Sequence, residues 1–534
     1  MPAISLAMMS PAVSDKGVVA APHALAVETG RAILEEGGNA VEAAVAMGAT
    51  IAVTYPHMTG LGGDGFMLVR EPDGRVGVVE ACGPAGAGAT IRAYRDAGHG
   101  VVPPRGPLGA ATVAGVAAGW KLALETARGR LPLKLLLSDA ISHARAGFAV
   151  SEGQAANRAK LAEQLFAAPG FAGHFLRDGK LPAAGEVLRQ EKLADTLEHL
   201  SRAGLGDFYR GDVAREIAAD LDAIGSPVTR EDLEDYEARL RAPLRLKLKS
   251  CTLFNAPPPT QGLASLLILG IAERLDLGRH DGADFVHGLV EATKRAFLIR
   301  DRAVTDPRYA GDDPESFLAP GRLDREAAAI SRERAQPWPA PPGEGDTVWM
   351  GVIDREGRAV SYIQSLYWEW GSGCVLPGTG ILWQNRACSF ALDEGARNPL
   401  QPGRLPFHTL NPPIAVMKDG RVIAYGSQGG DGQPQTQAAI FVRYAGYGLG
   451  LAEAVDAPRW RLGKGWGEPE TALKIEPRMD GAVVDRLAAR GHEVQLLDRP
   501  YSSETGQAGM VVLHPEGRIE GVHDPRADGG ASGV

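Results

Sequence analysis

Hydrophobic periodicity divides this chain into a helical first part and a strand-rich second part. Residues 24–36 have apolar positions at helical spacing, and Gly37-Gly38 ends the predicted helix because glycine tolerates left-handed geometry. Asn39 is placed to cap a second helix, with Glu42 as its reciprocal partner three residues later. That second helix is apolar nearly all round, so we expect it to be buried.

Short β runs come next, at residues 66–70 and 75–80, and the Glu71–Gly74 turn between them predicts a hairpin. Residues 106–300 have a mostly helical pattern, interrupted by the proline-rich stretch 255–259, which cannot be helical. Strand patterns dominate after residue 346. We predict strands at 348–353, 359–367, 380–383, 414–417, 422–426 and 510–514.

A proline-rich segment, residues 333–346, joins the two parts. Its four prolines and two glycines resist regular structure. One interpretation is a plain linker between domains. The other is a site of self-cleavage, because the segment runs directly into a predicted strand that opens with Thr347, a hydroxyl residue. Self-cleavage of a chain requires such an arrangement.

Composition argues against several classes of function. The chain has 534 residues, a formal net charge of −9 and no basic stripe, so we expect no nucleic-acid partner. The four cysteines form no CxxC pair and the histidines no HExxH motif, so we expect neither a disulfide scaffold nor a metal or other cofactor. The longest apolar run, residues 263–272, is shorter than the roughly 20 residues of a membrane span. The N-terminus has no basic residue ahead of its apolar part, and we predict a cytoplasmic protein without membrane association.

The segment Gly60–Gly65 matches GxGxxG, and Glu80 lies about 20 residues downstream, as in a dinucleotide-binding fingerprint. That fingerprint needs a strand before it and a helix after it. Here a buried helix precedes the glycines and a hairpin comes after them. We therefore interpret the glycines as a close-packed backbone crossing.

Thr347 and a second glycine-rich turn are candidates for hydrolytic chemistry. If the Thr347 hydroxyl attacks the carbonyl of Asp346, hydrolysis of the resulting ester leaves Thr347 with a free α-amine, whose pKa is near ~8. That amine can serve as general base for its own hydroxyl. Gly429 and Gly430, in GSQGGDG, can present consecutive N–H groups to an oxyanion. The simpler interpretations are an ordinary strand residue and an ordinary turn.

Together these stretches resemble the γ-glutamyltransferase family of N-terminal-nucleophile hydrolases. The similarity runs colinearly over about residues 17–527. The matching stretches are GGNAVEAAVA (37–46), GLGGDGFML (60–68), FYRGDVAREIA (208–218), NAPPPTQGLASL (255–266), EATKRAFLIRDRAVTDP (291–307), DTVWMGVIDREGRAVS (346–361), GSQGGDG (426–432), EAVDAPRWR (453–461) and DPRADGGA (524–531).

The resemblance implies an α+β fold, a four-layer αββα sandwich with two antiparallel sheets between helices. It also implies cleavage into a large subunit, 1–346, and a small subunit, 347–534, which together form one fold, and it leaves open a homodimer of that heterodimer. Thr347 matches the family nucleophile, Ser365 falls where the family has a supporting threonine, and Gly429 and Gly430 match the oxyanion pair.

The substrate-binding positions depart from the family pattern. Where the family has the Arg and the Asp that hold a γ-glutamyl group, this chain has Cys82 and Ser389, while Tyr367 replaces an Asn and His408-Thr409 replace paired serines. A thiol cannot imitate a bidentate contact between arginine and a carboxylate, and such charged hydrogen bonds contribute about 1.5–3 kcal/mol each. We therefore expect γ-glutamyl compounds to be poor substrates.

The changed positions favour a small anionic amide. Aromatic residues 367, 368, 370 and 383 add bulk near the nucleophile strand, Arg386 stands where relatives have a neutral or acidic residue, and the segment from Ser389 to His408 is too short for the family's lid. This pattern resembles the oxamate amidohydrolase branch, which acts in purine (allantoin) catabolism. It implies hydrolysis of oxamate to oxalate and ammonia through an acyl-enzyme on Thr347. In the alternative interpretation the aromatic residues are core packing and Arg386 pairs with a surface acid.

Three other functions remain open from the sequence alone. The first is a γ-glutamyltransferase or glutathione hydrolase with an altered clamp. The second is a cephalosporin-type acylase, which needs a roomier pocket. The third is a non-catalytic relative, against which the intact Thr347, Ser365 and Gly429-Gly430 argue.

Overall fold

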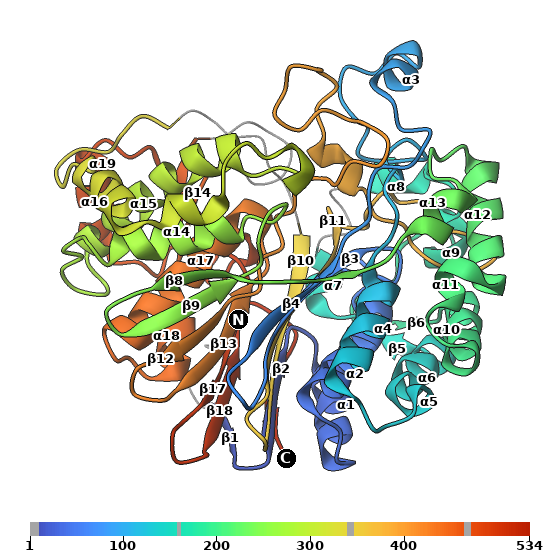
Figure 1. Ribbon diagram of the computed structural model, residues 1–534, viewed down its shortest axis with the longest axis horizontal. Helices are drawn as coiled ribbons and strands as arrows, with labels where there is room; N and C mark the ends of the chain where they lie inside the picture. Colours follow the sequence, from blue (N-terminus) through green and yellow to red (C-terminus); the bar gives the residue numbers. More distant parts are fainter. Residues whose placement is uncertain (1–9, 157–161, 339–345, 464–470) are drawn as a thin grey trace.

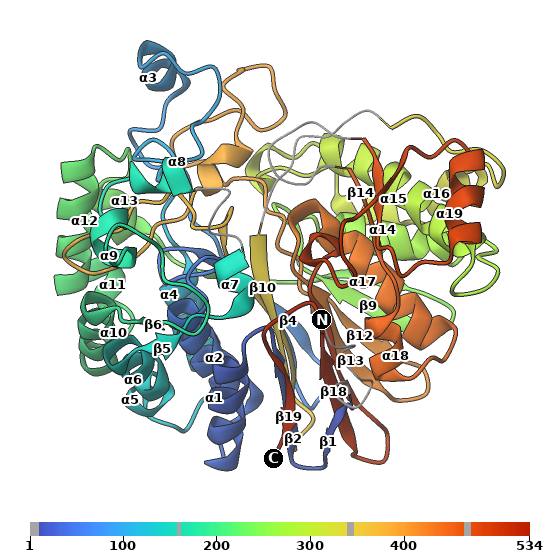
Figure 2. The same cartoon turned by 180° about the vertical axis from the view of Figure 1, so that it is seen from behind.

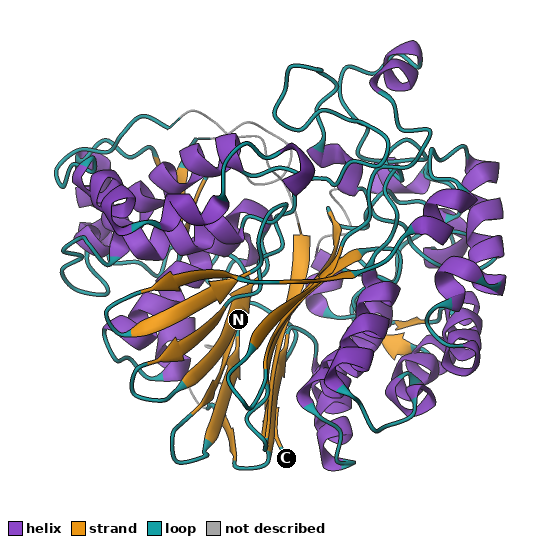
Figure 3. Cartoon of the chain, viewed as in Figure 1, coloured by secondary structure: helices purple, strands orange, loops and turns teal. Residues whose placement is uncertain are grey.

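The computed structural model describes residues 10–156, 162–338, 346–463 and 471–534. Over these residues, two seven-stranded sheets lie face to face, and helices cover the outer face of each sheet (Figure 1, Figure 3). The four-layer αββα sandwich implied by the resemblance is therefore confirmed. No helix of the described residues is both long and apolar enough to cross a bilayer.

The first sheet carries Thr347 and is antiparallel throughout, in the order β19-β2-β10-β11-β3-β4-β7. Its strands are β2 (Gly17–Ala21), β3 (Asp64–Arg70), β4 (Val76–Ala81), β7 (Arg239–Arg241), β10 (Asp346–Asp354), β11 (Ala359–Tyr367) and β19 (Gly530–Gly533).

The second sheet is also antiparallel, in the order β1-β18-β17-β13-β12-β9-β8. Its strands are β1 (Ala12–Ser14), β8 (Leu244–Lys247), β9 (Cys251–Asn255), β12 (Ile414–Met417), β13 (Val422–Ser427), β17 (Ala508–Leu513) and β18 (Ile519–His523). Each sheet combines strands from before and after residue 346, so the two parts of the chain form one fold.

Helices α1 (Ala24–Glu35), α2 (Ala40–Thr54) and α4 (Val116–Ala127) pack on the first sheet. The predicted capping box of Asn39 and Glu42 is confirmed, and every residue of α2 is buried. Further helices lie on the same side of the molecule, with α10 to α13 at its outer edge and α3 at the top (Figure 2): α3 (Ile91–Asp96), α5 (Leu133–Leu136), α6 (Ser138–Ala146), α7 (Glu152–Ala156), α8 (Ala162–Phe166), α9 (Phe171–Phe175), α10 (Glu191–Ala203), α11 (Asp207–Arg210), α12 (Asp212–Ile224) and α13 (Arg230–Asp235).

The second sheet is covered by a different group of helices, on the opposite side of the molecule (Figure 1, Figure 2). They are α14 (Gly262–Ala272), α15 (Ala283–Ala303), α16 (Pro320–Ala328), α17 (Gln433–Phe441), α18 (Leu451–Asp456) and α19 (Gly481–Ala489). Short strands outside the two sheets are β5 (Phe148–Ala149), β6 (Val187–Leu188), β14 (Trp460–Leu462), β15 (Leu473–Ile475) and β16 (Val494–Leu496).

Trp349 of β10 fills the space between the sheets close to Thr347. Its indole is almost fully buried and donates from Nε1 to Ser361 Oγ at 2.9 Å. A Cβ at Gly426 would lie 2.0 Å from its Cδ1, and one at Gly509 would lie 2.4 Å from its Cζ3. Glycine in the facing strands therefore makes room for the indole.

The glycine motif before β3 is a close backbone crossing, as predicted, and it leads into a strand and not into a helix. A Cβ at Gly63 would lie 2.3 Å from the Ser365 carbonyl oxygen, and one at Gly62 would lie 2.4 Å from the Leu382 carbonyl oxygen. Backbone can approach this closely only where side chains are absent. The crossing seats β11 and its Ser365 against the start of β3.

Two parts of the predicted secondary structure are wrong. Residues 380–383 form no strand and make only isolated bridges, because Trp383 and its neighbours turn into the core. Strands β7, β8 and β9 lie inside the region predicted as mainly helical. In β8, Leu244 and Leu246 are buried while the residues between and after them are exposed, so a period of two was present in a stretch too short to stand out.

Candidate active site

Thr347 lies at an irregularity in the pairing of β10 with β11. The register shifts between Asp346 and Val348, so Thr347 faces two residues, Ser365 and Leu366. A bulge of this kind re-aims side chains and is frequent beside active sites. Thr347 is fully buried at this point.

The Thr347 hydroxyl has two hydrogen-bond partners among the described residues. It donates from Oγ1 to Ser365 Oγ at 3.4 Å, and it accepts from Gln433 Nε2 at 3.2 Å. Ser365 Oγ in turn accepts from the backbone N–H of Tyr367 at 2.7 Å. The structure therefore brings Thr347 and Ser365 together as predicted. It adds Gln433, whose sequence signal was an amide residue directly after the GSQGGDG turn.

Gly429 and Gly430 form the turn after β13, with φ of 116° and 53°. These left-handed values suit glycine. Neither backbone N–H donates a hydrogen bond to another described residue, whereas the Gly430 carbonyl accepts from Gln261 Nε2 at 2.8 Å. Two consecutive N–H groups are thus left without an acceptor among the described residues, and their oxyanion role stays a prediction. Buried Arg300 secures the turn through Gln261 Oε1 and Asp431, each at 2.9 Å.

Arg386 opens a short 3-10 helix, Arg386–Ser389, and is fully buried. Its Nη1 donates to Thr409 Oγ1 at 3.4 Å, and its Cζ lies 3.9 Å from the centre of the Tyr367 ring. Its Nε and Nη2 have no hydrogen-bond partner, and no carboxylate of the described residues lies at ion-pair distance. Pairing of Arg386 with a surface acid is therefore wrong.

Tyr367 connects the guanidinium with the nucleophile. Its backbone N–H bonds to Ser365, the neighbour of Thr347, while its ring stacks against Arg386. Its φ of 84° is unusual for a residue with a side chain. Strain of this kind persists where the surroundings enforce it, and it is concentrated at functional sites.

His408 and Thr409 complete this side of the site. His408 is fully buried, and burial together with the charge of Arg386 lowers its pKa well below the usual value, so its ring is neutral. Thr409 presents its hydroxyl to Arg386, and its carbonyl accepts from Gln261 Nε2 at 2.8 Å and Asn411 Nδ2 at 2.9 Å. The nucleophile and the guanidinium are thus joined through Asn411 and Gln433 as well as through Tyr367.

The comparison with known families decides what this arrangement is. The sequence model of the γ-glutamyltranspeptidase family matches residues 26–534. The chain is 49% identical over 530 residues to the oxamate amidohydrolase proenzyme of Klebsiella pneumoniae, which covers 98% of this chain and 100% of that protein. The chain belongs to the γ-glutamyltranspeptidase family.

Other members of the family are similar over the whole chain. The glutathione hydrolase-like YwrD proenzyme of Bacillus subtilis is 40% identical over 526 residues, covering 98% of this chain and 99% of that protein. The crystal structure of cephalosporin acylase from Bacillus halodurans superposes with a TM-score of 0.92 at 30% identity, covering 100% of this chain and 98% of that one. This family member is therefore an N-terminal-nucleophile amidohydrolase.

Asp64 is a charged residue of the site that sequence reasoning missed. Its Oδ1 accepts from the backbone N–H groups of Gly83 and Gly115, at 3.3 and 3.1 Å, and from Gln384 Nε2 at 3.1 Å. Its Oδ2 lies 3.2 Å from His408 Nε2, without the angle of a hydrogen bond. Burial raises the pKa of Asp64 to about 7, against the opposing charge of Arg386. The signal was an acid inside the motif GLGGDG.

Cys82 and Ser389 contact neither Thr347 nor Arg386 through a hydrogen bond among the described residues. Cys82 comes after β4 and is buried, and burial raises the pKa of its thiol well above the usual value. The carbonyl of Ser389 accepts from Asn398 Nδ2 at 3.3 Å. Neither side chain carries a charge that could hold an amino acid, in line with the sequence analysis.

The core-packing interpretation is right for two of the aromatic residues. Trp370 packs against Phe171 and Phe175, with ring centres 5.3 and 4.8 Å away. Trp383 donates from Nε1 to the carbonyl of Thr112 at 3.0 Å within the same core. Tyr367, by contrast, stacks on the guanidinium.

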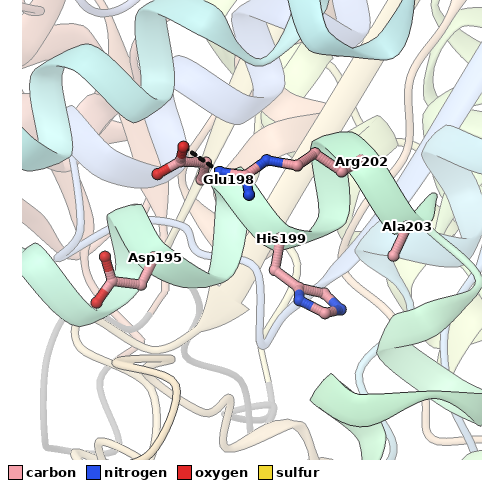
Figure 4. Close-up of a pocket in the computed structure, with 5 residues that line it drawn as sticks. All are labelled: Asp195, Glu198, His199, Arg202 and Ala203. Carbon is pink, nitrogen blue, oxygen red and sulfur yellow. Dashed lines mark hydrogen bonds and ion pairs between the residues drawn. The ribbon is translucent and has the colours of Figure 1, made fainter.

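A hollow on α10 is remote from this chemistry. It is lined by Asp195, Glu198, His199, Arg202 and Ala203, all from one helix of the outer layer (Figure 4). Arg202 pairs with Glu198 across it. None of the predicted site residues lines it.

A buried group beside the linker has the composition of a metal site. His287 and Glu291 of α15 and His492 after α19 bring their ligand atoms within 4.8 Å of one another. Protein partners already use these atoms. His287 Nδ1 lies 2.8 Å from His492 Nε2, His287 Nε2 lies 2.7 Å from the carbonyl of Ser331, and Glu291 accepts from Lys294 Nζ at 2.6 Å.

The same group holds the segment that leads to the predicted cleavage site. Glu291 Oε2 accepts from the backbone N–H of Gln336 at 3.1 Å, and Lys294 Nζ donates to its carbonyl at 2.7 Å. The buried ion pair of Glu291 and Lys294 therefore hydrogen-bonds both the N–H and the carbonyl of Gln336. Residues 339–345 of the predicted linker lie outside the described residues.

Proposed function

We propose that this protein cuts itself at Asp346–Thr347 and then hydrolyses oxamate to oxalate and ammonia on Thr347, as part of purine catabolism. The observation that carries the substrate is Arg386, a fully buried guanidinium with two unpartnered nitrogens beside the nucleophile strand. The identity of 49% to an oxamate amidohydrolase proenzyme supports the same substrate.

Self-cleavage starts from the uncut chain. Thr347 Oγ attacks the carbonyl carbon of Asp346, the peptide C–N bond breaks, and the hydroxyl proton ends on the new amine of Thr347. Water then hydrolyses the ester, so residues 1–346 end in a carboxylate and residues 347–534 begin with Thr347. The pairing of β10 with β11 is irregular at this peptide, where Thr347 faces two residues of β11.

Turnover reuses the same oxygen. The α-amine of Thr347 takes the proton of Oγ while Oγ attacks the amide carbon of the substrate. The N–H groups of Gly429 and Gly430 stabilise the oxyanion, and the amine returns the proton to the departing ammonia. Water hydrolyses the acyl ester by the reverse sequence of proton transfers and releases the second product.

Recognition of the carboxylate falls to Arg386. Its forked donors fit a carboxylate better than an ammonium would. Its Nε and Nη2 have no hydrogen-bond partner among the described residues and can bind the carboxylate. Its Nη1 donates to Thr409, and one face of the guanidinium stacks on the Tyr367 ring. Neutral His408 and the uncharged Cys82 and Ser389 provide no second ionic contact, so a substrate with one negative charge fits better than an amino acid.

Two measurements test the proposal. Mass spectrometry of purified protein should show two chains, the smaller beginning at Thr347. Ammonia release should be fast with oxamate and slow with oxamide, which lacks the carboxylate. A γ-glutamyl anilide should give a kcat/KM below the ordinary enzyme range of about 10⁴ M⁻¹s⁻¹. Faster turnover of the anilide than of oxamate contradicts the proposed substrate.

A cephalosporin-type acylase is the second candidate, favoured by the TM-score of 0.92 to the Bacillus halodurans enzyme. That activity must admit a bulky bicyclic product. Thr347, Arg386, His408 and Thr409 are all fully buried here, which favours the small substrate. Hydrolysis of a cephalosporin side-chain amide in preference to oxamate would support the acylase instead.

A further inference from the structure

We infer that Gln433 is a catalytic hydrogen-bond donor to the nucleophilic oxygen, acting in self-cleavage and in turnover. This inference rests on the proposed role of Thr347. Gln433 is the first residue of α17, directly after the turn that holds the candidate oxyanion donors, and it is fully buried. Its Nε2 lies 3.2 Å from Thr347 Oγ1, although 86 residues separate the two in sequence.

The orientation of the Gln433 amide is set by its neighbours. Asn411 Nδ2 lies 2.9 Å from the carbonyl oxygen of Thr409, which can only accept a hydrogen bond. The same nitrogen lies 3.0 Å from Gln433, so the Gln433 atom facing it must be the acceptor Oε1. The other atom of the amide, facing Thr347, is therefore the donor Nε2. A flipped amide would set two donors against each other.

Asn411 is itself fixed by the surrounding scaffold. Its backbone carbonyl accepts from Gln437 Nε2 at 3.0 Å, and its Oδ1 lies 3.5 Å from Asn255 Nδ2 at the end of β9. All of these residues are buried. The chain of amides thus fixes the orientation of the N–H that Gln433 donates to the nucleophile.

The chemical effect depends on where the hydroxyl proton lies. Because Thr347 Oγ1 accepts from Gln433, its own proton points elsewhere, and the structure directs it to Ser365 Oγ at 3.4 Å. As the proton leaves and negative charge grows on Oγ1, a hydrogen bond from a neutral donor strengthens. Gln433 therefore stabilises the attacking oxygen and holds it in place, in the uncut chain as well as in the cleaved enzyme.

The test compares Gln433→Leu and Gln433→Glu with Gln435→Leu. Gln435 lies on the same helix and is buried, but its Nε2 donates to the carbonyls of Asp431 and Leu462 and not to Thr347. Gln433→Leu should slow self-cleavage and lower kcat per cleaved chain by about 10²–10³, as removal of one preorganised donor does, with KM little changed. Gln435→Leu should lower the melting temperature without either effect.

The Gln433→Glu variant separates donation from packing. A carboxylate of the same shape cannot donate, whereas the protonated acid can. Its rate of self-cleavage, relative to the natural chain at the same pH, should therefore rise as pH falls. This readout remains decisive if Gln433→Leu does not fold.

A folded Gln433→Leu variant with natural rates, or a Gln433→Glu rate ratio that is flat with pH, overturns the inference. The proposed function has a separate control in Thr347→Ala. If that variant is cleaved at the same bond or stays active, the role of Thr347 is wrong. If it is inert while Gln433→Leu is normal, only the role of Gln433 is wrong.

Discussion

The proposed nucleophile and the proposed carboxylate pocket are neighbours, but they are completed in different ways. Around Thr347 the protein supplies both hydrogen-bond partners of the hydroxyl, Ser365 and Gln433. Around Arg386, two guanidinium nitrogens, one oxygen of Asp64 and both ring nitrogens of His408 have no hydrogen-bond partner among the described residues. Buried polar atoms are normally paired, so the second region has the features of a surface built to receive a polar ligand.

Timing explains this difference. In the proposed sequence of reactions the precursor cuts itself before any substrate arrives, so the nucleophile has to be set up by the protein alone. The carboxylate pocket acts only in turnover, and its unpaired groups can be satisfied by the substrate. Variants of the two regions should therefore differ in their effects. Changes at the nucleophile should affect both self-cleavage and turnover, and changes at Arg386 should affect turnover alone.

Loss of the nucleophile should have the largest effect. We expect Thr347→Ala to remain a single chain and to lose at least about 10³ in kcat/KM, because no acyl-enzyme can form. Thr347→Ser keeps a hydroxyl and should still be cleaved at the same bond. Mass spectrometry and ammonia release measure both. A new N-terminus at any other residue would place the nucleophile elsewhere.

Loss of the Arg386 guanidinium should have the second-largest effect. Arg386→Ala should cost about 2–5 kcal/mol in kcat/KM for oxamate, because the substrate carboxylate is left buried without a partner. Arg386→Lys should mainly raise KM, since an ammonium lacks the fork. Self-cleavage should proceed at the natural rate in both variants, as seen on a gel.

His408→Ala is the matched comparison for that experiment. Its ring is neutral, so the loss should be smaller than for Arg386→Ala. If His408→Ala abolishes turnover while Arg386→Ala does not, the carboxylate is held by His408. If neither variant matters, the substrate is not a small anion.

These two regions also show which features could be predicted from the sequence and which could not. Local signals predicted the capped helix at Asn39, the hairpin, and strands β10 and β11, because caps, turns and alternation are properties of neighbouring residues. Motif resemblance pointed to Thr347 and Ser365, which the structure places in contact. By contrast, the sequence marks Asp64 and Gln433 only as an acid and an amide beside glycine motifs, and their roles depend on residues far along the chain.

The titration of Asp64 should make the stability of the protein depend on pH. Its pKa is raised by burial to about 7, above its value in an unfolded chain, so the folded protein holds the proton more tightly. The free energy of unfolding should therefore fall as pH rises towards 7 and lose this dependence above it. Thermal unfolding of the natural chain and of Asp64→Asn, measured on both sides of pH 7, should show a slope that the variant lacks.

The same titration should act on substrate affinity. Below its pKa Asp64 is neutral and leaves the charge of Arg386 to the substrate. Above it, the carboxylate competes for that charge, so KM for oxamate should rise as pH passes 7. KM is the quantity to monitor, because kcat also reflects the amine of Thr347, which titrates near ~8. A natural enzyme whose KM is flat with pH would show that Asp64 does not couple to the substrate.

The smallest effect on the two reactions is expected outside both regions. There, Glu291 and Lys294 hydrogen-bond the backbone of Gln336, which precedes the proposed cleavage site. Changing Lys294 alone would leave a buried carboxylate unpaired and destabilise the fold by roughly 3–5 kcal/mol. The paired change Glu291→Gln with Lys294→Met removes both charges and the donor to the Gln336 carbonyl. We expect self-cleavage to slow several-fold, because the linker loses its anchor, while kcat of the cleaved enzyme stays the same.

The exposed pair Lys121 and Glu125, changed to Met and Gln, is the matched control and should alter neither rate. If the buried double variant is cleaved as fast as this control, the anchor serves stability alone, and preparation of the nucleophile is local to β10 and α17.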